Sequence, residues 1–311
     1  MKARTSSARP VLALMVSLAL ATTAPVRSAA QELEPRSYSN APVGFNFLLV
    51  GYTYSLGGLS VDPSEPLQGA QLRIHSGVLA YARALNVWGK SGKVDVVLPL
   101  LELSGTGTVA GEPAERRISG FGDPRLRFSV NLYGAPALSM KDFGQYQRDL
   151  VVGASVQVYS PLGQYDPSKA INLGTNRWAI KADVGFSKAL KAFTLDVTTG
   201  AAFYGDNHDY LGGRSLVQSP VYAAQTNLSY DFGHDVWAAI GATYYRGGRT
   251  TLNGDVNSSA LGNARAGAEL VLPLSRRQSV KLAHSRGVYT RVGTAFSLFA
   301  IVWQYRWGAG Y

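Results

Sequence analysis

The chain has 311 residues, of which 34 are glycine and 17 are tyrosine, and a formal net charge of +10. It contains no cysteine, which excludes the small secreted folds that depend on disulfides. The glycine share exceeds the usual value of about 7 %, and tyrosine favours interfaces that are apolar on one side and wet on the other.

The first thirty residues have the pattern of a secretory signal peptide. Basic residues precede a mostly apolar run over residues 11–21, and the small residues Ser28 and Ala30 occupy the positions that a signal peptidase reads. We therefore predict a signal peptide over residues 1–30 and a mature domain over residues 31–311. Its formal charge is +6, because four basic residues leave with the signal (10 − 4). No mature segment has 18 consecutive apolar residues, so the sequence predicts no membrane-spanning helix.

The mature domain contains twelve stretches in which apolar and polar side chains alternate. In the fourth stretch, Leu126 and Phe128 take one face while Arg125 and Arg127 take the other. Such alternation predicts strands with one apolar and one polar face. The predicted strands cover residues 44–55, 71–84, 93–103, 124–133, 149–160, 176–188, 192–204, 220–232, 235–246, 263–272, 278–287 and 295–307.

The connections between these strands alternate in length. Short turns occur near residue 190, at 233–235 and near 276, and the long connections are 56–70, 104–123, 161–175, 205–219 and 247–262. An outer-membrane barrel has this asymmetry, with short periplasmic turns, long external loops and an even number of strands, whereas an exported β-sandwich needs neither feature. We therefore predict an all-β fold, a transmembrane antiparallel β-barrel of about 12 strands, outer-membrane type.

One long connection, residues 134–148, falls on the periplasmic side of this barrel. It has room for a short helix, although a register that is wrong by one hairpin would also explain its length.

The chain ends in a strand whose apolar face is aromatic. Pairing of this strand with the first one would remove both edges of the sheet. Its alternating side chains resemble the signal by which outer-membrane barrels are recognised for assembly, and they are Phe299, Ile301, Trp303, Tyr305, Trp307 and Tyr311.

Several sequence blocks resemble one known family in their order and spacing. They include GFGDPRLRFSVNLYGAPALS (120–139), VYSPLGQYDPSKAINLGTNRWAIKADVGFSKAL (158–190) and LPLSRRQSVKLAHSRGVYTRVG (272–293). The chain resembles the outer-membrane transporter family named for a MetA-type pathway of phenol degradation. This resemblance implies passage of aromatic or other apolar growth substrates, and it supplies no catalytic residue.

The residues themselves offer no catalytic or metal-binding constellation. The four histidines share no ligand spacing. His75 and Ser76 could suggest a base and a nucleophile, but neighbours on a strand point to opposite faces. Three Asp-Pro pairs, at residues 62, 123 and 166, fit turns better than a calcium site. We therefore predict no enzyme, no cofactor and no metal.

The polar faces of the strands would line the lumen of the barrel. They carry six basic and four acidic residues, namely Asp95, Arg125, Arg127, Arg177, Lys181, Asp183, Asp196, Arg265, Glu269 and Arg306. One interpretation is a paired charge ladder that fills a narrow barrel, because buried charges need partners. The other is a pore whose basic surplus favours anions.

These features predict an outer-membrane channel of a Gram-negative bacterium for passive uptake of small organic solutes, either aromatic compounds or organic anions. The expected partners are outer-membrane lipid, the barrel-assembly machinery and the solutes, and not nucleic acid. The alternative is a non-transporting barrel whose long loops, which carry Tyr165 and Tyr210, bind a macromolecule or a polysaccharide.

Overall fold

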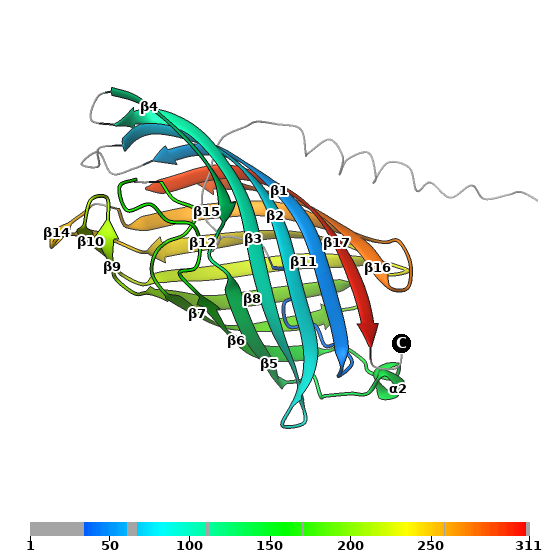
Figure 1. The fold of residues 1–311 in the computed structure, drawn as a ribbon. Coiled ribbons are helices and arrows are strands. Elements are labelled where there is room, and N and C mark those ends of the chain that lie inside the picture. The colour runs from blue at the N-terminus through cyan, green and yellow to red at the C-terminus, as the bar shows by residue number, and fades with distance from the viewer. Residues whose placement is uncertain (1–33, 61–66, 110–111, 170, 258, 309–311) are drawn as a thin grey trace, which may run out of the picture.

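The computed structural model of the protein describes residues 34–60, 67–109, 112–169, 171–257 and 259–308. Strands make up most of these ranges (Figure 1). The predicted signal peptide and Tyr311 lie outside the described residues. Within the described ranges, no helix is long and apolar enough to cross a membrane.

Twelve strands form the wall in the described part of the chain, and the fourth is interrupted. Both β4 and β5 pair with β3, so together they act as one wall strand that is broken at residues 122–124. All twelve predicted strands are confirmed. The wall consists of β1 (Phe45–Ser60), β2 (Leu67–Val87), β3 (Lys90–Val109), β4 (Glu112–Phe121) with β5 (Arg125–Tyr133), β6 (Leu150–Tyr159), β7 (Ala179–Leu190), β8 (Phe193–Tyr204), β11 (Val221–Gly233), β12 (Val236–Gly247), β15 (Leu261–Pro273), β16 (Gln278–Tyr289) and β17 (Gly293–Gly308).

The pairing of β1 with β17 closes the barrel. Phe45 lies opposite Gly308, and Tyr54 lies opposite Phe299, in an antiparallel register that covers the whole of β1. On its other side β1 pairs with β2, and β2 pairs with β3. Closure satisfies the backbone groups of the first and last strands, which would otherwise be open edges. The predicted twelve-stranded barrel is therefore confirmed.

The connections at one end of the barrel are short, and we call this the short-turn end. Two-residue turns join β2 to β3 and β11 to β12, where Trp88, His234 and Asp235 have the positive φ angles of tight hairpins. Residues 134–149 lie at the same end, since the amide of Val43, just before β1, donates to the carbonyl of Leu138 at 2.9 Å. This segment contains the short helix α2 (Met140–Phe143), as its length predicted.

The opposite end, which we call the long-loop end, contains more strand than predicted. Two connections predicted as loops, 56–70 and 104–123, are largely strand. Residues 56–70 continue β1 and β2, and residues 104–123 continue β3 and form β4, because these strands remain paired with one another beyond the predicted ends. The loops after β8 and β12 form a separate small sheet. Its strands are β9 (Asn207–Tyr210), β10 (Arg214–Gln218), β13 (Thr250–Leu252) and β14 (Asp255–Val256).

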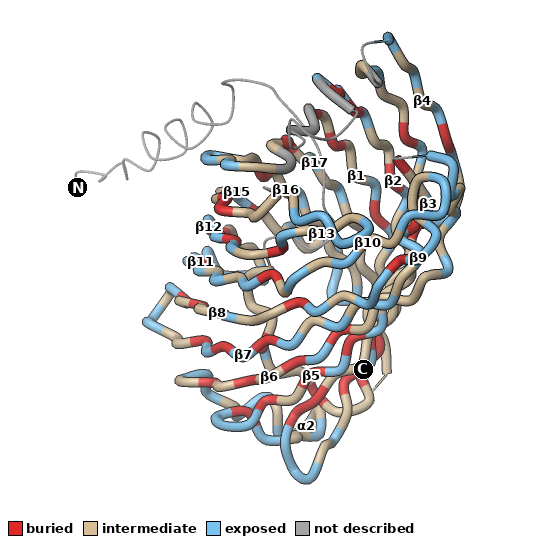
Figure 2. The backbone as a smooth tube through the Cα atoms, turned by 90° about the vertical axis from the view of Figure 1, so that its left-hand side faces the viewer, coloured by how far each residue is buried: buried red, intermediate tan, exposed pale blue. Residues whose placement is uncertain are grey.

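The two faces of the wall differ as the alternation predicts. On the outer face, Leu126 is 51 % exposed and Val184 47 %, whereas the neighbouring inward side chains Arg127 and Asp183 are 6 % and 7 % exposed. Figure 2 shows this alternation of buried and exposed positions along the strands. The outer face is thus apolar and exposed, while the inner face is polar and buried.

An arginine at an outer position near mid-strand should destabilise the barrel in a bilayer. Val184 lies in the middle of β7 and faces outward. Val184→Arg should lower the free energy of unfolding by about 2–4 kcal/mol in lipid vesicles, because a charge would enter hydrocarbon. Denaturant titration in vesicles measures this, with Val184→Leu as the control. Equal stability of the two variants would contradict the assigned faces.

Candidate functional site

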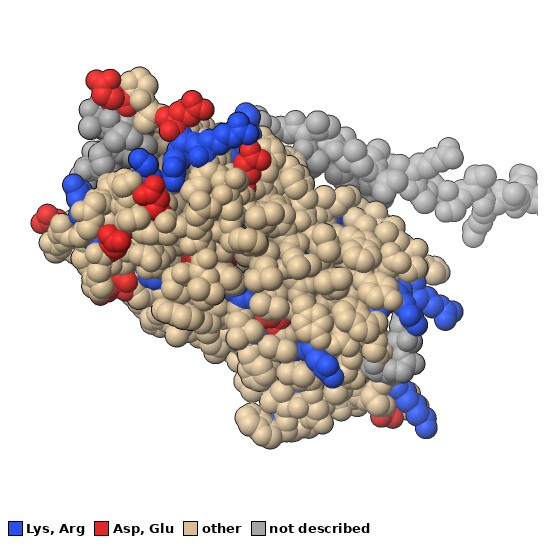
Figure 3. Space-filling view, viewed as in Figure 1, with Lys and Arg blue, Asp and Glu red and all other residues tan. Residues whose placement is uncertain are grey.

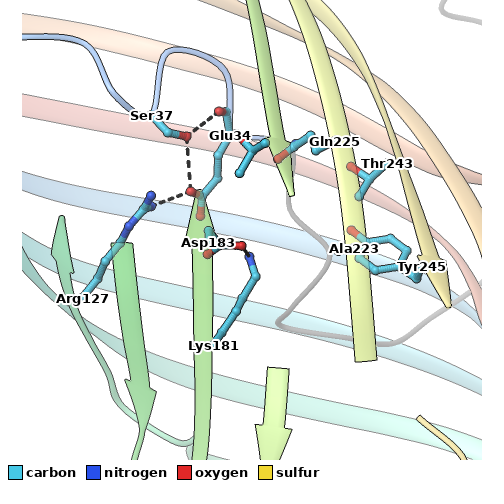
Figure 4. Close-up of a pocket in the computed structure, with 10 residues that line it drawn as sticks. Glu34, Ser37, Arg127, Lys181, Asp183, Ala223, Gln225, Thr243 and Tyr245 are labelled. Carbon is cyan, nitrogen blue, oxygen red and sulfur yellow. Dashed lines mark hydrogen bonds and ion pairs between the residues drawn. The ribbon is translucent and has the colours of Figure 1, made fainter. Parts of the chain in front are cut away.

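The segment before β1, residues 34–44, lies inside the barrel. At the short-turn end it is held by backbone hydrogen bonds, including that from the amide of Gly44 to the carbonyl of Ala84 at 3.0 Å. Farther in, the amide of Arg36 donates to Oδ2 of Asp196 at 3.1 Å, and the Glu34 carboxylate meets Arg127 of β5. We call residues 34–44 the plug segment, and part of it is seen in Figure 4.

Tyr38 of the plug segment occupies a niche made by two glycines. Gly153 of β6 and Gly185 of β7 are directly paired across the sheet. A Cβ atom at Gly153 would lie 2.2 Å from Cδ1 of Tyr38, and one at Gly185 would lie 2.9 Å from its Cε2. The tyrosine is 3 % exposed. The wall therefore lacks side chains at the place where the plug segment supplies a ring.

Glu34 of the plug segment forms ion pairs with the arginine side chains of β5. It forms ion pairs with Arg127 and, at 3.6 Å, with Arg125, which also lies 3.6 Å from Asp95. Burial alone would raise the pKa of Glu34, but the charges of Arg127 and Arg125 outweigh burial and hold this pKa well below its ordinary value. Glu34 is thus a carboxylate that the arginines keep ionised.

Other inward charges are also paired. Nζ of Lys181 lies 3.1 Å from Oδ1 of Asp183, whose Oδ2 accepts a hydrogen bond from Gln157. On the other side of the barrel, Lys281 and Glu269 are 3.3 Å apart. The structure therefore places many of the inward charges in a paired ladder, the first of the two interpretations of the lumen residues.

A narrow pocket remains between the plug segment and the wall. Its cavity volume is about 20 Å³, which is room for about one water molecule. Figure 4 shows its lining, with Glu34 and Arg127 on one side and Tyr245 on the other. The remaining lining residues are Ser37, Lys181, Asp183, Thr198, Ala223, Gln225 and Thr243.

The long-loop mouth of the lumen is apolar. Inward side chains of β2, β3, β4 and β17 form one buried cluster there, and two residues of the loop after β6 pack against them. The backbone of this loop is tied to the wall through the amide of Gln164, which donates to the carbonyl of Phe121 at 2.8 Å. The cluster, which we call the apolar mouth, consists of Ala70, Leu72, Leu103, Ile118, Phe296 and, from the loop, Ile171 and Leu173.

Two of the predicted lumen arginines lie near the long-loop end. The guanidinium carbon of Arg265 is 3.5 Å from the ring centroid of Phe296 in the apolar mouth, and its Nη2 donates to Ser285. Arg177 precedes β7, stacks over Tyr204 at 4.9 Å and donates to Gln218. Arg265 therefore lies next to the apolar mouth, whereas Arg177 lies against the ring of Tyr204 on the other strands of this end.

The predicted Arg306 lies at the short-turn rim and not within the lumen. Its Nη2 is 3.3 Å from Oδ2 of Asp235, and its Nε donates to the carbonyl of Arg276 at 2.8 Å. Of the residues predicted to form the C-terminal assembly signal, Phe299 and Ile301 are about half exposed on the outer face, and Trp303, Tyr305 and Trp307 form a stack.

Sequence reasoning missed the plug segment, with Glu34, Arg36 and Tyr38. Its contacts with the wall join residues 40 or more positions apart (84 − 44), and it has no strand alternation. One available signal was the predicted basic surplus of the lumen, because buried cations need carboxylates from elsewhere. The inward Lys93, whose Nζ lies 3.5 Å from the carbonyl oxygen of Ser37, was also missed.

The predicted absence of a catalytic pair is consistent with the geometry of β2. Nδ1 of His75 lies 2.6 Å from the hydroxyl of Tyr52 on the outer face, whereas Ser76 is buried on the inner face. In the described ranges, no group of three or more His, Asp and Glu side chains is placed to hold a metal ion.

Closure, strand number, alternation and loop asymmetry together define a β-barrel of the outer-membrane type. The chain belongs to the family described as "Putative MetA-pathway of phenol degradation", whose model matches residues 54–304. No curated protein matches the chain.

Solved structures that are similar to this barrel include the following two. The COG4313 outer membrane channel from Pseudomonas putida F1 is 20 % identical, with a TM-score of 0.76 over 89 % of this chain and 100 % of that one. The transport unit of the autotransporter AIDA-I from Escherichia coli is 10 % identical, with a TM-score of 0.52 over 89 % of this chain and 94 % of that one. At these identities the likeness shows the fold.

Filling the glycine niche should expel the plug segment. The chain has no cysteine, so Ser37→Cys introduces one unique thiol inside the barrel. A valine at Gly153 would collide with Tyr38. We expect Gly153→Val to speed maleimide labelling of this thiol about tenfold, which corresponds to about 1.4 kcal/mol of lost packing. Gly77→Val is the control, since a Cβ there lies 4.0 Å from its nearest neighbour. Equal labelling rates in the two backgrounds would refute the docking of Tyr38.

The plug segment should hold at mildly acidic pH. Because the pKa of Glu34 lies below its ordinary value of 4.5, its ion pairs stabilise the plugged state fully above about pH 4.5. This stability is lost only as the pH falls further. Labelling of the Ser37→Cys thiol, corrected for thiol ionisation, should therefore be constant from pH 8 to about pH 5. Glu34→Gln should raise it throughout that range, and an opening near pH 6 in the parent would contradict the assignment.

Proposed function

We propose that the protein is an outer-membrane channel for the passive entry of small organic solutes. The observation that carries the proposal is the plug segment. A barrel that served only as a surface scaffold could fill its lumen with wall side chains, yet here the wall is glycine at Gly153 and Gly185 and a separate segment supplies Tyr38. A segment outside the wall can leave the lumen without breaking the barrel.

The proposed orientation follows from the two ends of the barrel. In outer-membrane barrels the short turns face the periplasm and the long loops face outward. The plug segment would then enter from the periplasmic side, after removal of the predicted signal peptide. Membrane insertion through the barrel-assembly machinery would use the aromatic strand that ends the chain.

The lumen favours a solute with an apolar body and a negative group. An aromatic ring fits the apolar mouth, where Leu72 and Phe296 lie, and a carboxylate fits Arg265 beside it or Arg177 elsewhere at the long-loop end. Aromatic carboxylates combine the two solute classes that the sequence left open. The description of the family, which refers to phenol degradation, supports an aromatic solute.

The alternative function is binding of a macromolecule by the long loops. The small sheet of β9, β10, β13 and β14 gives these loops an ordered surface. Tyr165, however, is used within the loops, since its hydroxyl donates to the carbonyl of Asp209 at 2.9 Å and accepts from Asn207. We therefore place this alternative second.

Conductance in planar bilayers tests the channel. Removal of residues 34–40 should raise the single-channel conductance severalfold, because the segment fills the lumen, and Val184→Leu serves as a control that leaves the lumen unchanged. In a salt gradient the reversal potential should favour anions, and Arg177→Gln should weaken that preference.

Two results would decide against parts of the proposal. If both the full chain and the deletion variant are electrically silent, and loss of the protein leaves uptake of aromatic acids unchanged, the loop-binding alternative stands instead. A conducting barrel that prefers cations would leave the channel intact and reject the role given to Arg177 and Arg265.

A further inference from the structure

Three arginines lie in one row across the outer face of the wall. Arg73 and Arg117 are exposed, and Arg286 is half-buried. Their side chains point outward, as those of Phe299 and Tyr54 do. Phe299 and Tyr54 lie two residues along β17 and β1 from the members of this row on those strands. From β16 to β4 the paired positions of this row are Arg286, Ser297, Leu56, Arg73, Ser104 and Arg117. We call it the arginine row.

The next row toward the short-turn end contains aromatic rings and histidine side chains. His284 stacks on Phe299 with ring centroids 4.4 Å apart, and Tyr54 lies 5.0 Å from His75. These residues belong to one row of the sheet, because Phe299 pairs with Tyr54 and Tyr54 pairs with His75. Rings with a polar edge are typical of the boundary between hydrocarbon and headgroups. The arginine row lies just beyond this boundary.

The height of the apolar band agrees with this placement. The other aromatic girdle is at the short-turn end, where Trp307 stacks on Tyr305 and lies opposite Asn46. Along β1, Asn46 and Leu56 of the arginine row are ten residues apart. At about 3.4 Å per residue and a strand tilt of about 40°, this is roughly 25 Å along the membrane normal. An outer-membrane barrel has an apolar band of about that height.

Charge identifies the ligand of the arginine row. Arg117 pairs with Glu102 at 2.8 Å, but both side chains are well exposed, at 75 % and 47 %, and such surface pairs are weak. Glu115 also has outward parity, one row farther toward the loops. Arg73 on β2 and Arg117 on β4 are separated by one strand, β3, so their backbone positions are about 10 Å apart. Guanidinium groups at this spacing fit phosphate oxygens, which they bind in a bidentate manner.

We propose that the arginine row binds the phosphate groups of a lipid headgroup in the leaflet at the long-loop end. Where it crosses β1 and β2, the row lies at headgroup height, next to an aromatic girdle, and toward the loops from a broad surface with few charges (Figure 3). The bound lipid would fix the depth of β1, β2, β16 and β17 in the membrane. The inference rests on the outer-membrane placement proposed above, and it needs no transport through the lumen.

The test uses the full mature chain in detergent micelles with lipid A, which carries two phosphate groups, as the probe. Binding is followed by the shift of the thermal unfolding midpoint during lipid titration. Arg73→Gln/Arg286→Gln should weaken binding about tenfold or more, because two charge-assisted contacts are lost. Arg83→Gln is the matched control, since Arg83 is exposed on the same strand and face but near the short-turn end, opposite Asn46.

Three results would overturn the inference. The first is that the double variant and Arg83→Gln have equal affinity for lipid A. The second is that the parent binds lipid A without its phosphates as well as intact lipid A. The third is that inorganic phosphate alone shifts the unfolding midpoint of the parent as much as lipid A does. Heat-modifiable migration shows whether each variant is folded, and Arg73→Gln alone replaces the double variant if that one does not fold. Conductance of the same proteins in neutral-lipid bilayers separates the two proposals. A barrel that is electrically silent but binds lipid A through this row would contradict only the proposed channel function.

Discussion

The pairing of β1 with β17 is the constraint on which the rest of the structure depends. A sheet in hydrocarbon cannot leave backbone N–H and C=O groups unpaired, so the first and last strands must meet. Their register runs from Phe45 and Gly308 to Ser60 and Gly293. Closure fixes which residues face inward on every other strand, because alternation then continues from one paired strand to the next.

Closure also creates an interior that must be filled. Twelve strands enclose a lumen in which polar side chains are removed from bulk water, and each charge there needs a partner. In this protein the partners come from two sources. The wall supplies Asp183 for Lys181, and the plug segment supplies Glu34 for Arg125 and Arg127. The plug segment is therefore bound by the same charges that a solute would meet.

Local sequence patterns predicted the wall because its determinants are local. Alternation with period two identified all twelve strands, and the Asp-Pro turn at Asp166 is used as predicted, with its carboxylate accepting from the amide of Ser168 two residues further on. The strand extensions beyond residue 104 were missed because their Thr-Gly-rich sequence looks like loop. They are strands because β3 and β4 pair with each other.

The lumen could be predicted only in part, since its contacts join distant residues. The predicted Arg127 and Asp183 are buried and inward. Lys181, the partner of Asp183, lies two residues away on the same face, but Glu34, the partner of Arg127, could not be read from spacing. Nothing near Tyr38 in the sequence indicates Gly153 and Gly185, and the glycines by themselves suggest only weak strands. Arg306 was assigned to the lumen from its parity, which gives the face of a residue but not its height.

Residues 34–44 are packed inside the barrel, and this packing underlies both the filled lumen and the proposed channel. Hydrogen exchange at the backbone amide of Arg36, which is bound to the Asp196 carboxylate within the lumen, tests it in the unmodified chain. In the purified barrel we expect this amide to exchange orders of magnitude more slowly than an unstructured peptide, as the amides of the wall strands do. Exchange of Arg36 at the rate of an unstructured peptide, with the wall strands still protected, would contradict it.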